Sequence, residues 1–104
     1  MGERFTPALD RELKKRRIKK GIIASVTGAL SEFSIITIYR NSMKKPPDHF
    51  ARKYKVAVEL MGNGFVADGK AHVHASLGAE NGCTYCGHLV DGTVTYFADI
   101  GVIY

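Results

Sequence analysis

Several features that would define a class of protein are missing from these 104 residues. No apolar run approaches the ~18 residues that a membrane-spanning helix needs. The chain does not open with a charged segment followed by an apolar one, as an export signal does. The chain has only two cysteines, too few for the disulfide framework of a small secreted domain. Together these absences lead us to expect a cytoplasmic protein.

Familiar catalytic and nucleotide-binding signatures are also lacking. The glycine-containing stretches GNG and GAENG do not lie between a strand and a helix, so they do not predict a phosphate-binding loop. No Ser-His-Asp arrangement has recognisable surroundings, and no alternation of basic and aromatic residues predicts a platform for single-stranded nucleic acid. The length allows one domain over residues 1–104, and 45% apolar with 24% charged residues is ordinary for a globular fold.

The positive charge is concentrated near the N-terminus. Net charge is +5, and residues 11–20 (RELKKRRIKK) hold seven of the 15 Lys and Arg side chains with a single Glu. Such a block attracts phosphate backbones. A solvated helix face is the favoured explanation, because the helix dipole favours cations near a helix C-terminus. The candidates for nucleic-acid contact are Lys14, Lys15, Arg16, Arg17, Lys19 and Lys20.

Residues 1–20 predict a basic helical region, and residues 21–104 predict a β-rich core. Thr6 is expected to be the N-cap, and Pro7 suits the first helical position. Leu9 and Leu13 recur at helical spacing, and Gly21 is expected to end the helix.

The pattern from residue 21 onward is that of strands. Residues 21–30 and 33–40 are rich in Ile, Val, Thr, Phe and Tyr, with Gly28 between them expected at a bend or a close backbone approach. Residues 41–50 predict a polar loop with two prolines and His49. Further strands are expected at 54–61, 71–77, 83–90 and 91–104, with turns at GNGF, at Asp68-Gly69 and at GAENG. The sequence therefore predicts an α+β domain, one main N-terminal helix packed on a mostly antiparallel, strongly curved sheet of about six strands.

His72 and His74 are two apart on an expected strand, so their imidazoles project to the same face. A hairpin centred near residues 80–81 would return His88 opposite about residue 73. Three neutral imidazoles could then share one divalent ion and leave a position open for water. Zinc is the first candidate, and Cu, Ni or Fe also suit imidazole ligands. The alternative is three polar side chains that face solvent and bind nothing.

The C-x-x-C motif of Cys83 and Cys86 competes for the same ion, with His88 as a third ligand. Two residues three apart on a continuous strand point to opposite faces, which argues against Cys83 and Cys86 binding the same ion. No helix follows the motif, so a thioredoxin-like role is not predicted. Free thiols are the favoured interpretation, with local zinc or disulfide chemistry as alternatives.

Glu59 is the carboxylate within an otherwise apolar strand. It is a candidate general base or a partner of a metal ligand. The alternatives are a place on the solvated face or at a subunit contact.

The motifs HVHASLG and GCTYCGHLVDGTV, with ADIGVI near the end, resemble the plants-and-prokaryotes-conserved (PPC) domain. Upstream, GIIASVTGALSEFSI and YKVAVELMGNGF are similar to further family segments, so the resemblance runs from about residue 21 to 104. It implies a compact α+β domain that assembles as a homotrimer. Its stand-alone prokaryotic members are described as candidate DNA-binding proteins, and the family's histidine cluster, a metal site in some members, maps onto His72, His74 and His88. The fold also resembles that of alpha-acetolactate decarboxylase, a three-histidine metalloenzyme.

The chain departs from the family pattern in several places. The usual first strand before the helix is missing, which would leave a sheet edge bare. Cys86 stands where the family has a glycine, and Glu59 is displaced from the usual acidic position. No Arg-Gly-Arg-Pro core occurs, which excludes minor-groove binding by an AT-hook.

Three functions fit these observations. The first is a homo-oligomeric, metal-binding module that is part of a DNA-associated regulatory complex. The second is a small three-histidine metalloenzyme acting on a small carbonyl or ester substrate, and the third is an assembly protein whose histidines bind nothing. The many β-branched and aromatic residues of so small a chain favour an oligomer in each case.

Overall fold

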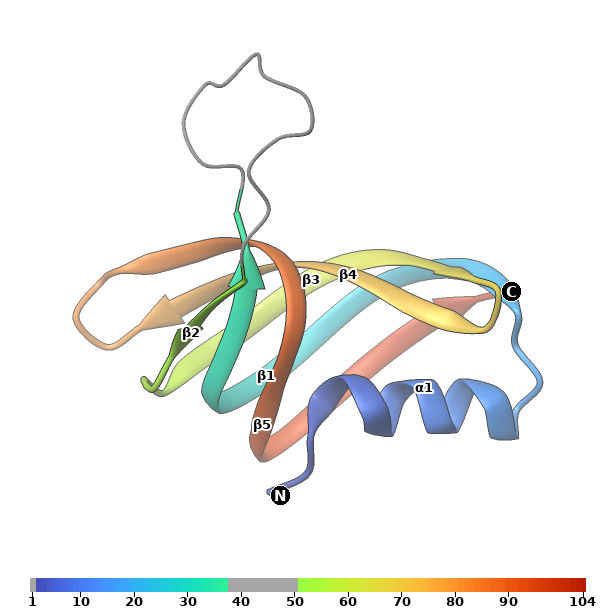
Figure 1. Ribbon diagram of the computed structural model, residues 1–104, viewed down its shortest axis with the longest axis horizontal. Helices are drawn as coiled ribbons and strands as arrows, with labels where there is room; N and C mark the ends of the chain where they lie inside the picture. The colour runs from blue at the N-terminus through green and yellow to red at the C-terminus, as the bar shows by residue number, and fades with distance from the viewer. Residues whose placement is uncertain (1, 38–50) are drawn as a thin grey trace, which may run out of the picture.

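The computed structural model describes residues 2–37 and 51–104. One N-terminal helix packs on a strongly curved antiparallel sheet, as expected (Figure 1). The expected loop at 41–50, with His49, lies outside the described residues. The elements in chain order are α1 (Phe5–Lys15), β1 (Lys20–Ile36), β2 (Ala51–Tyr54), β3 (Val58–Ala67), β4 (Lys70–Ala79) and β5 (Thr84–Ile103).

β1 and β5 each span two of the six expected strands, and β2 and β3 take the place of the one strand expected at 54–61, so five strands are described. β1 runs through Gly28 without interruption, and β5 runs through Asp91-Gly92, where the expected strands 83–90 and 91–104 meet. Gly28 instead lets the backbones of β1 and β5 approach closely, because a Cβ there would lie 2.5 Å from the carbonyl oxygen of Phe97. A Cβ at Gly92 would lie 2.7 Å from a methyl group of Leu30, so this glycine is needed for packing rather than for a turn.

The sheet wraps back on itself. The strand order is β2-β1-β3-β4-β5, and β1 also pairs with β5. Val26 of β1 pairs with Gly62 of β3 on one edge and with Ile100 of β5 on the other. The Asp68-Gly69 turn joins β3 to β4 as expected, and both residues have the positive φ that this hairpin turn requires (52° and 76°).

Alternation along the strands separates an inner face from an outer face. Val73, Ala75 and Leu77 of β4 are buried, so His72, His74 and Ser76 lie on the opposite, outer face. The inner face packs against α1 through a stripe of buried residues at helical spacing. The buried core consists of Phe5, Leu9, Leu13, Ile18, Ile23, Val26, Leu30, Phe33, Ile35, Val58, Leu60, Val66, Val73, Ala75, Leu77 and Leu89.

Both expected ends of α1 are wrong. The helix ends at Lys15, because Arg17 takes a left-handed conformation (φ 58°) and the amide of Ile18 donates to the carbonyl of Leu13. This turn places Ile18 in the core, while Gly21 lies within β1. The helix is too short and polar to cross a membrane, and no other helix occurs in residues 2–37 and 51–104.

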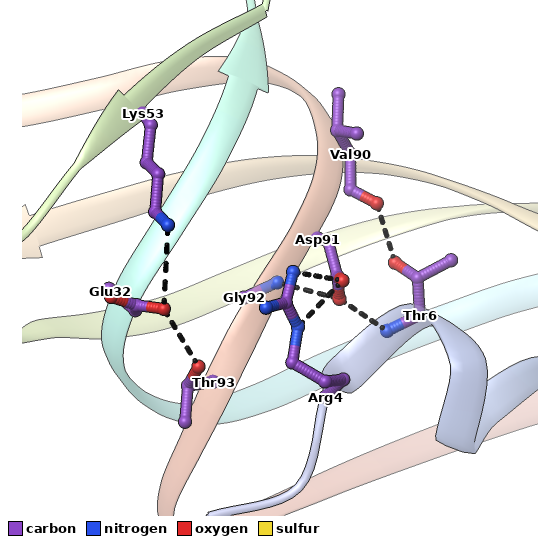
Figure 2. A network of polar contacts seen from close by, with 8 residues as sticks. All are labelled: Arg4, Thr6, Glu32, Lys53, Val90, Asp91, Gly92 and Thr93. Atoms are coloured by element: carbon purple, nitrogen blue, oxygen red, sulfur yellow. Dashed lines mark hydrogen bonds and ion pairs between the residues drawn. The ribbon is translucent and has the colours of Figure 1, made fainter.

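The N-terminus of α1 is capped by a residue of strand β5 rather than by Thr6 (Figure 2). The N-cap residue is Arg4, which makes no side-chain cap. Asp91 of β5 accepts a hydrogen bond from the amide of Thr6 (3.1 Å) and forms an ion pair with the guanidinium of Arg4 (2.6 Å). The Thr6 hydroxyl donates to the carbonyl of Val90 (2.8 Å). A carboxylate at a helix N-terminus is favoured by the unpaired amides and by the dipole.

Replacing Asp91 with alanine is expected to lower the free energy of unfolding by about 1–2 kcal/mol, because the helix is deprived of its cap and Arg4 of its partner. Urea denaturation measures this change. Glu80→Ala removes an exposed carboxylate from the β4–β5 turn and serves as the control. Equal stability of the two variants would contradict a capping role for Asp91.

Candidate metal centre

The β4–β5 register brings the three candidate histidines together on the outer face of the sheet. His74 pairs directly with His88, one residue from the position expected from the sequence. The ring centroids of His74 and His88 lie 5.8 Å apart, and those of His72 and His88 lie 6.4 Å apart. The three imidazoles therefore form one cluster contributed by two neighbouring strands.

β3 supplies the neighbours of this cluster, and the sequence did not single them out. Phe65 pairs with His72 across the strands, and its ring stacks on the imidazole with centroids 4.7 Å apart and planes inclined by 14°. Asn63 pairs with His74. The GNGF stretch predicted as a turn is thus part of β3.

Gly62 and Gly64 explain the GNG pattern of that stretch. A Cβ at Gly62 would collide with the carbonyl oxygen of His74, and one at Gly64 with that of His72. The glycines let β3 approach the backbone of the two histidines closely. The glycine pattern is visible in the sequence, but it reflects a contact between β3 and β4 rather than a turn.

The surroundings of His88 favour its neutral form. Burial, followed by the nearby charges of His74 and His72, lowers the pKa of His88 from its ordinary value of 6.5. A neutral ring offers a nitrogen lone pair, which is the form that binds a metal ion.

The three histidines are ligands of a type that binds divalent metals, and the pairing of β4 with β5 brings them side by side. Their side chains do not converge on one point. Among residues 2–37 and 51–104, no group of three or more His, Cys, Asp or Glu side chains stands arranged to hold an ion. Two imidazoles on one tetrahedral zinc, each at 2.0–2.1 Å, have centroids about 5 Å apart. The observed separations of 5.8 and 6.4 Å are longer than this.

A model of the Plants and Prokaryotes Conserved (PCC) domain matches residues 1–103. The chain belongs to this family. The resemblance to the PPC domain drawn from the histidine motifs is thereby confirmed.

Solved structures share the fold of this PCC domain. A plant- and prokaryote-conserved (PPC) protein from Pyrococcus horikoshii is 27% identical, with a TM-score of 0.71, over 97% of this chain and 70% of its own. A candidate DNA-binding protein from Bacteroides thetaiotaomicron is 20% identical, with a TM-score of 0.72, over 97% and 70%. A metal-containing protein from Archaeoglobus fulgidus is 21% identical, with a TM-score of 0.72, over 97% and 71%. No curated protein matches the chain.

Both cysteines of this PCC domain are free and exposed. Cys86 pairs with Ser76 across the strands, and its thiol donates to the Ser76 hydroxyl (3.5 Å). Ser76 is four residues from His72 along β4, which at about 3.3 Å per residue is about 13 Å. Cys86 therefore shares the outer face with His88, two residues away, and lies about 13 Å along the strands from the level of His72.

The structure does not bring Glu59 into the cluster. Glu59 is exposed on β3 and pairs with Gly78. It is four residues from Asn63, the partner of His74, so the strand rise separates them by about 13 Å.

The six basic candidates form an exposed block from the last turn of α1 to the start of β1. Only Arg16 has a described ion pair among them, with Glu12 at 3.2 Å. The block consists of Lys14, Lys15, Arg16, Arg17, Lys19 and Lys20, all exposed.

In metal-free protein, the free energy of unfolding is expected to fall as the pH drops below 6.5. The folded pKa of His88 is lowered, so the unfolded chain binds the proton first and is favoured in acid. Urea unfolding at neutral and mildly acidic pH measures this slope. His88→Asn should flatten it and His49→Asn should not, and equal slopes for the parent chain and His88→Asn would contradict the lowered pKa.

Proposed function

We propose that this chain is a homo-oligomeric, metal-binding PCC domain whose divalent ion, zinc in the first place, is held by His72, His74 and His88. The observation that carries the proposal is the direct pairing of His74 with His88 on a face that also presents His72. The Archaeoglobus fulgidus neighbour, described as a metal-containing protein, supports it. The free thiols of Cys83 and Cys86 support a reducing compartment such as the cytoplasm.

Binding is favoured over catalysis by the surroundings of the histidines. His74 is exposed on an open sheet face, whereas an enzyme for a small carbonyl or ester substrate needs a concave site that excludes water. Its candidate base, Glu59, is about 13 Å along β3 from the residue opposite His74. A bound ion would supply Lewis acidity in such an enzyme, but the described residues near it, Asn63 and Ser76, are not general bases at neutral pH.

Alanine at His72, His74 or His88 is expected to weaken zinc binding by more than about 100-fold, since loss of even an indirect partner of a metal ligand costs 10- to 100-fold. Competition with a chromophoric chelator measures the affinity and the expected stoichiometry of one ion per chain. His49→Ala is the control, because it also removes one histidine, and it should bind zinc as tightly as the parent chain. Unchanged affinity in the three variants would refute the site.

The exposed basic block supports a second role, contact with DNA. Its charges are clustered on one end of α1 and the following turn, and the Bacteroides thetaiotaomicron neighbour is described as a candidate DNA-binding protein. Such contact would be with phosphates and would not read base sequence. It adds to the metal-binding proposal without depending on it.

Glutamine at Lys14 and Lys15 is expected to weaken duplex binding and to reduce the slope of log affinity against log salt by about 0.9 for each phosphate that the protein no longer neutralises. Fluorescence anisotropy with a labelled duplex at several salt concentrations measures both. Glutamine at Lys53 and Lys55, two exposed lysines in and just after β2 and outside the block, is the matched control. Identical slopes for the two double variants would exclude the basic block as a DNA-binding surface.

A further inference from the structure

His72 lies where the pairing between β4 and β5 ends. This pairing begins at Val73 and Leu89, one residue after His72. Beyond Leu89, β5 pairs with β1 alone among the described strands. His74 is held beside its direct partner His88, whereas His72 has no partner on β5 among the described residues. The position of His72 therefore depends on other elements of the fold.

Phe65 of β3 covers one face of the His72 imidazole. The two residues are direct partners across the strands, and their rings are stacked with centroids 4.7 Å apart and planes inclined by 14°. Phe65 is 48% exposed, so its ring does not fill the core. Its only ring contact among the described residues is with His72. An aromatic side chain on the outer face thus restrains one of the three candidate ligands.

Stacking and metal binding use different parts of an imidazole. The stack covers a face of the ring, whereas an ion binds the lone pair of a nitrogen at the ring edge. β4 lies between β3 and β5, so Phe65 and His88 are on opposite sides of His72. Phe65 therefore does not stand between the two histidines, and the edge of the His72 ring stays open to an ion.

The stack also survives the movement that a shared ion requires. The rings of His72 and His88 are 6.4 Å apart, and a shift of about 1.4 Å would bring them to the separation of about 5 Å expected on one zinc. The same shift lengthens the stack on Phe65 from 4.7 Å to about 6.1 Å at most. Aromatic pairs remain favourable at centroid distances up to about 7 Å. His72 can thus move toward His88 without leaving Phe65.

Asp10 of α1 holds the backbone beside His72. Its carboxylate oxygen Oδ1 accepts a hydrogen bond from the amide of Ala71 (3.0 Å). Ala71 precedes the first pair between β4 and β5, so the carboxylate serves this amide where the β4–β5 ladder has ended. The helix therefore fixes the backbone one residue before His72, while Phe65 fixes its ring.

We propose that Phe65 and Asp10 are positioning residues of the metal site, which hold His72 ready for the ion that it shares with His74 and His88. The proposal rests on the metal site of the proposed function and adds two residues that are not themselves ligands. His74 and His88 are held by pairing with each other, whereas His72 depends on β3 and α1. A side chain that is already held in place loses less entropy when it binds.

Substitution of Phe65 tests the stack. Phe65→Leu keeps an apolar side chain without a ring, and it is expected to weaken zinc binding about three- to tenfold, the cost of ordering one freed side chain. Phe65→Tyr keeps a ring and should bind zinc as the parent chain does. Met61→Leu, at another exposed apolar position of β3, is the control. Unchanged affinity in Phe65→Leu, equal weakening by Met61→Leu, or no recovery with tyrosine would overturn the role of Phe65.

The role of Asp10 is tested at the Ala71 amide. Asp10→Ala removes the acceptor, so hydrogen exchange of this amide should become faster and zinc affinity should fall by a similar three- to tenfold. Asp10→Asn keeps an oxygen that accepts the hydrogen bond and should behave as the parent chain does in both measurements. Slow exchange at Ala71 in Asp10→Ala, or zinc affinity equal to that of the parent, would contradict the role of Asp10.

A double-mutant cycle measures whether Phe65 acts through His72. In a His72→Ala chain, Phe65→Leu should change the remaining zinc affinity by less than about twofold, because position 72 then has no imidazole to hold. A further loss of three- to tenfold in that chain would mean that Phe65 acts on the site by another route, and the proposal would be wrong.

One readout needs no metal ion and separates this inference from the function on which it rests. In metal-free protein, the ring protons of His72 should resonate upfield in the parent chain and in Phe65→Tyr, because they lie over an aromatic face, and should lose this shift in Phe65→Leu. If the parent chain binds no zinc, the metal site and its positioning are both wrong. If the parent binds zinc and both Phe65→Leu and Asp10→Ala bind it as tightly, only this inference fails.

Discussion

The antiparallel register between β4 and β5 determines what both faces of the sheet carry. It pairs Val73 with Leu89 on the inner face and His74 with His88 on the outer face. A slip of one residue would exchange the two faces, bringing imidazoles into the core and exposing valine and leucine. The burial of Val73, Ala75 and Leu77 therefore fixes the histidine cluster, although none of these side chains touches an ion.

The same sheet leaves one part of the molecule incompletely covered. β1 and β5 are long enough to pair with several strands each, and Asp91 anchors α1 to the middle of β5. Beyond that anchor a cavity of about 690 Å³ lies between the helix and the end of β5, where β5 pairs with β1 alone among the described strands.

Much of this arrangement could be predicted from local sequence. Alternation placed His72 and His74 on one face, Asp68-Gly69 marked its hairpin, and the spacing of Leu9 and Leu13 marked the helix. The failures have tertiary causes. Asp91 caps a helix that is distant in sequence, and Gly62 and Gly64 make room for the backbone of β4 rather than forming a turn. Phe65 stacks on His72 only through pairing between strands, which the sequence of β3 alone does not reveal.

X-ray absorption at the zinc edge tests most directly whether His72, His74 and His88 share one ion. The account predicts a first shell of nitrogen and oxygen at about 2.0–2.1 Å, with imidazole scattering that decreases when one of the three histidines is replaced. A sulfur shell at about 2.3 Å would place the ion at Cys83 or Cys86 instead. That result, or imidazole scattering unchanged in all three variants, would contradict the central claim.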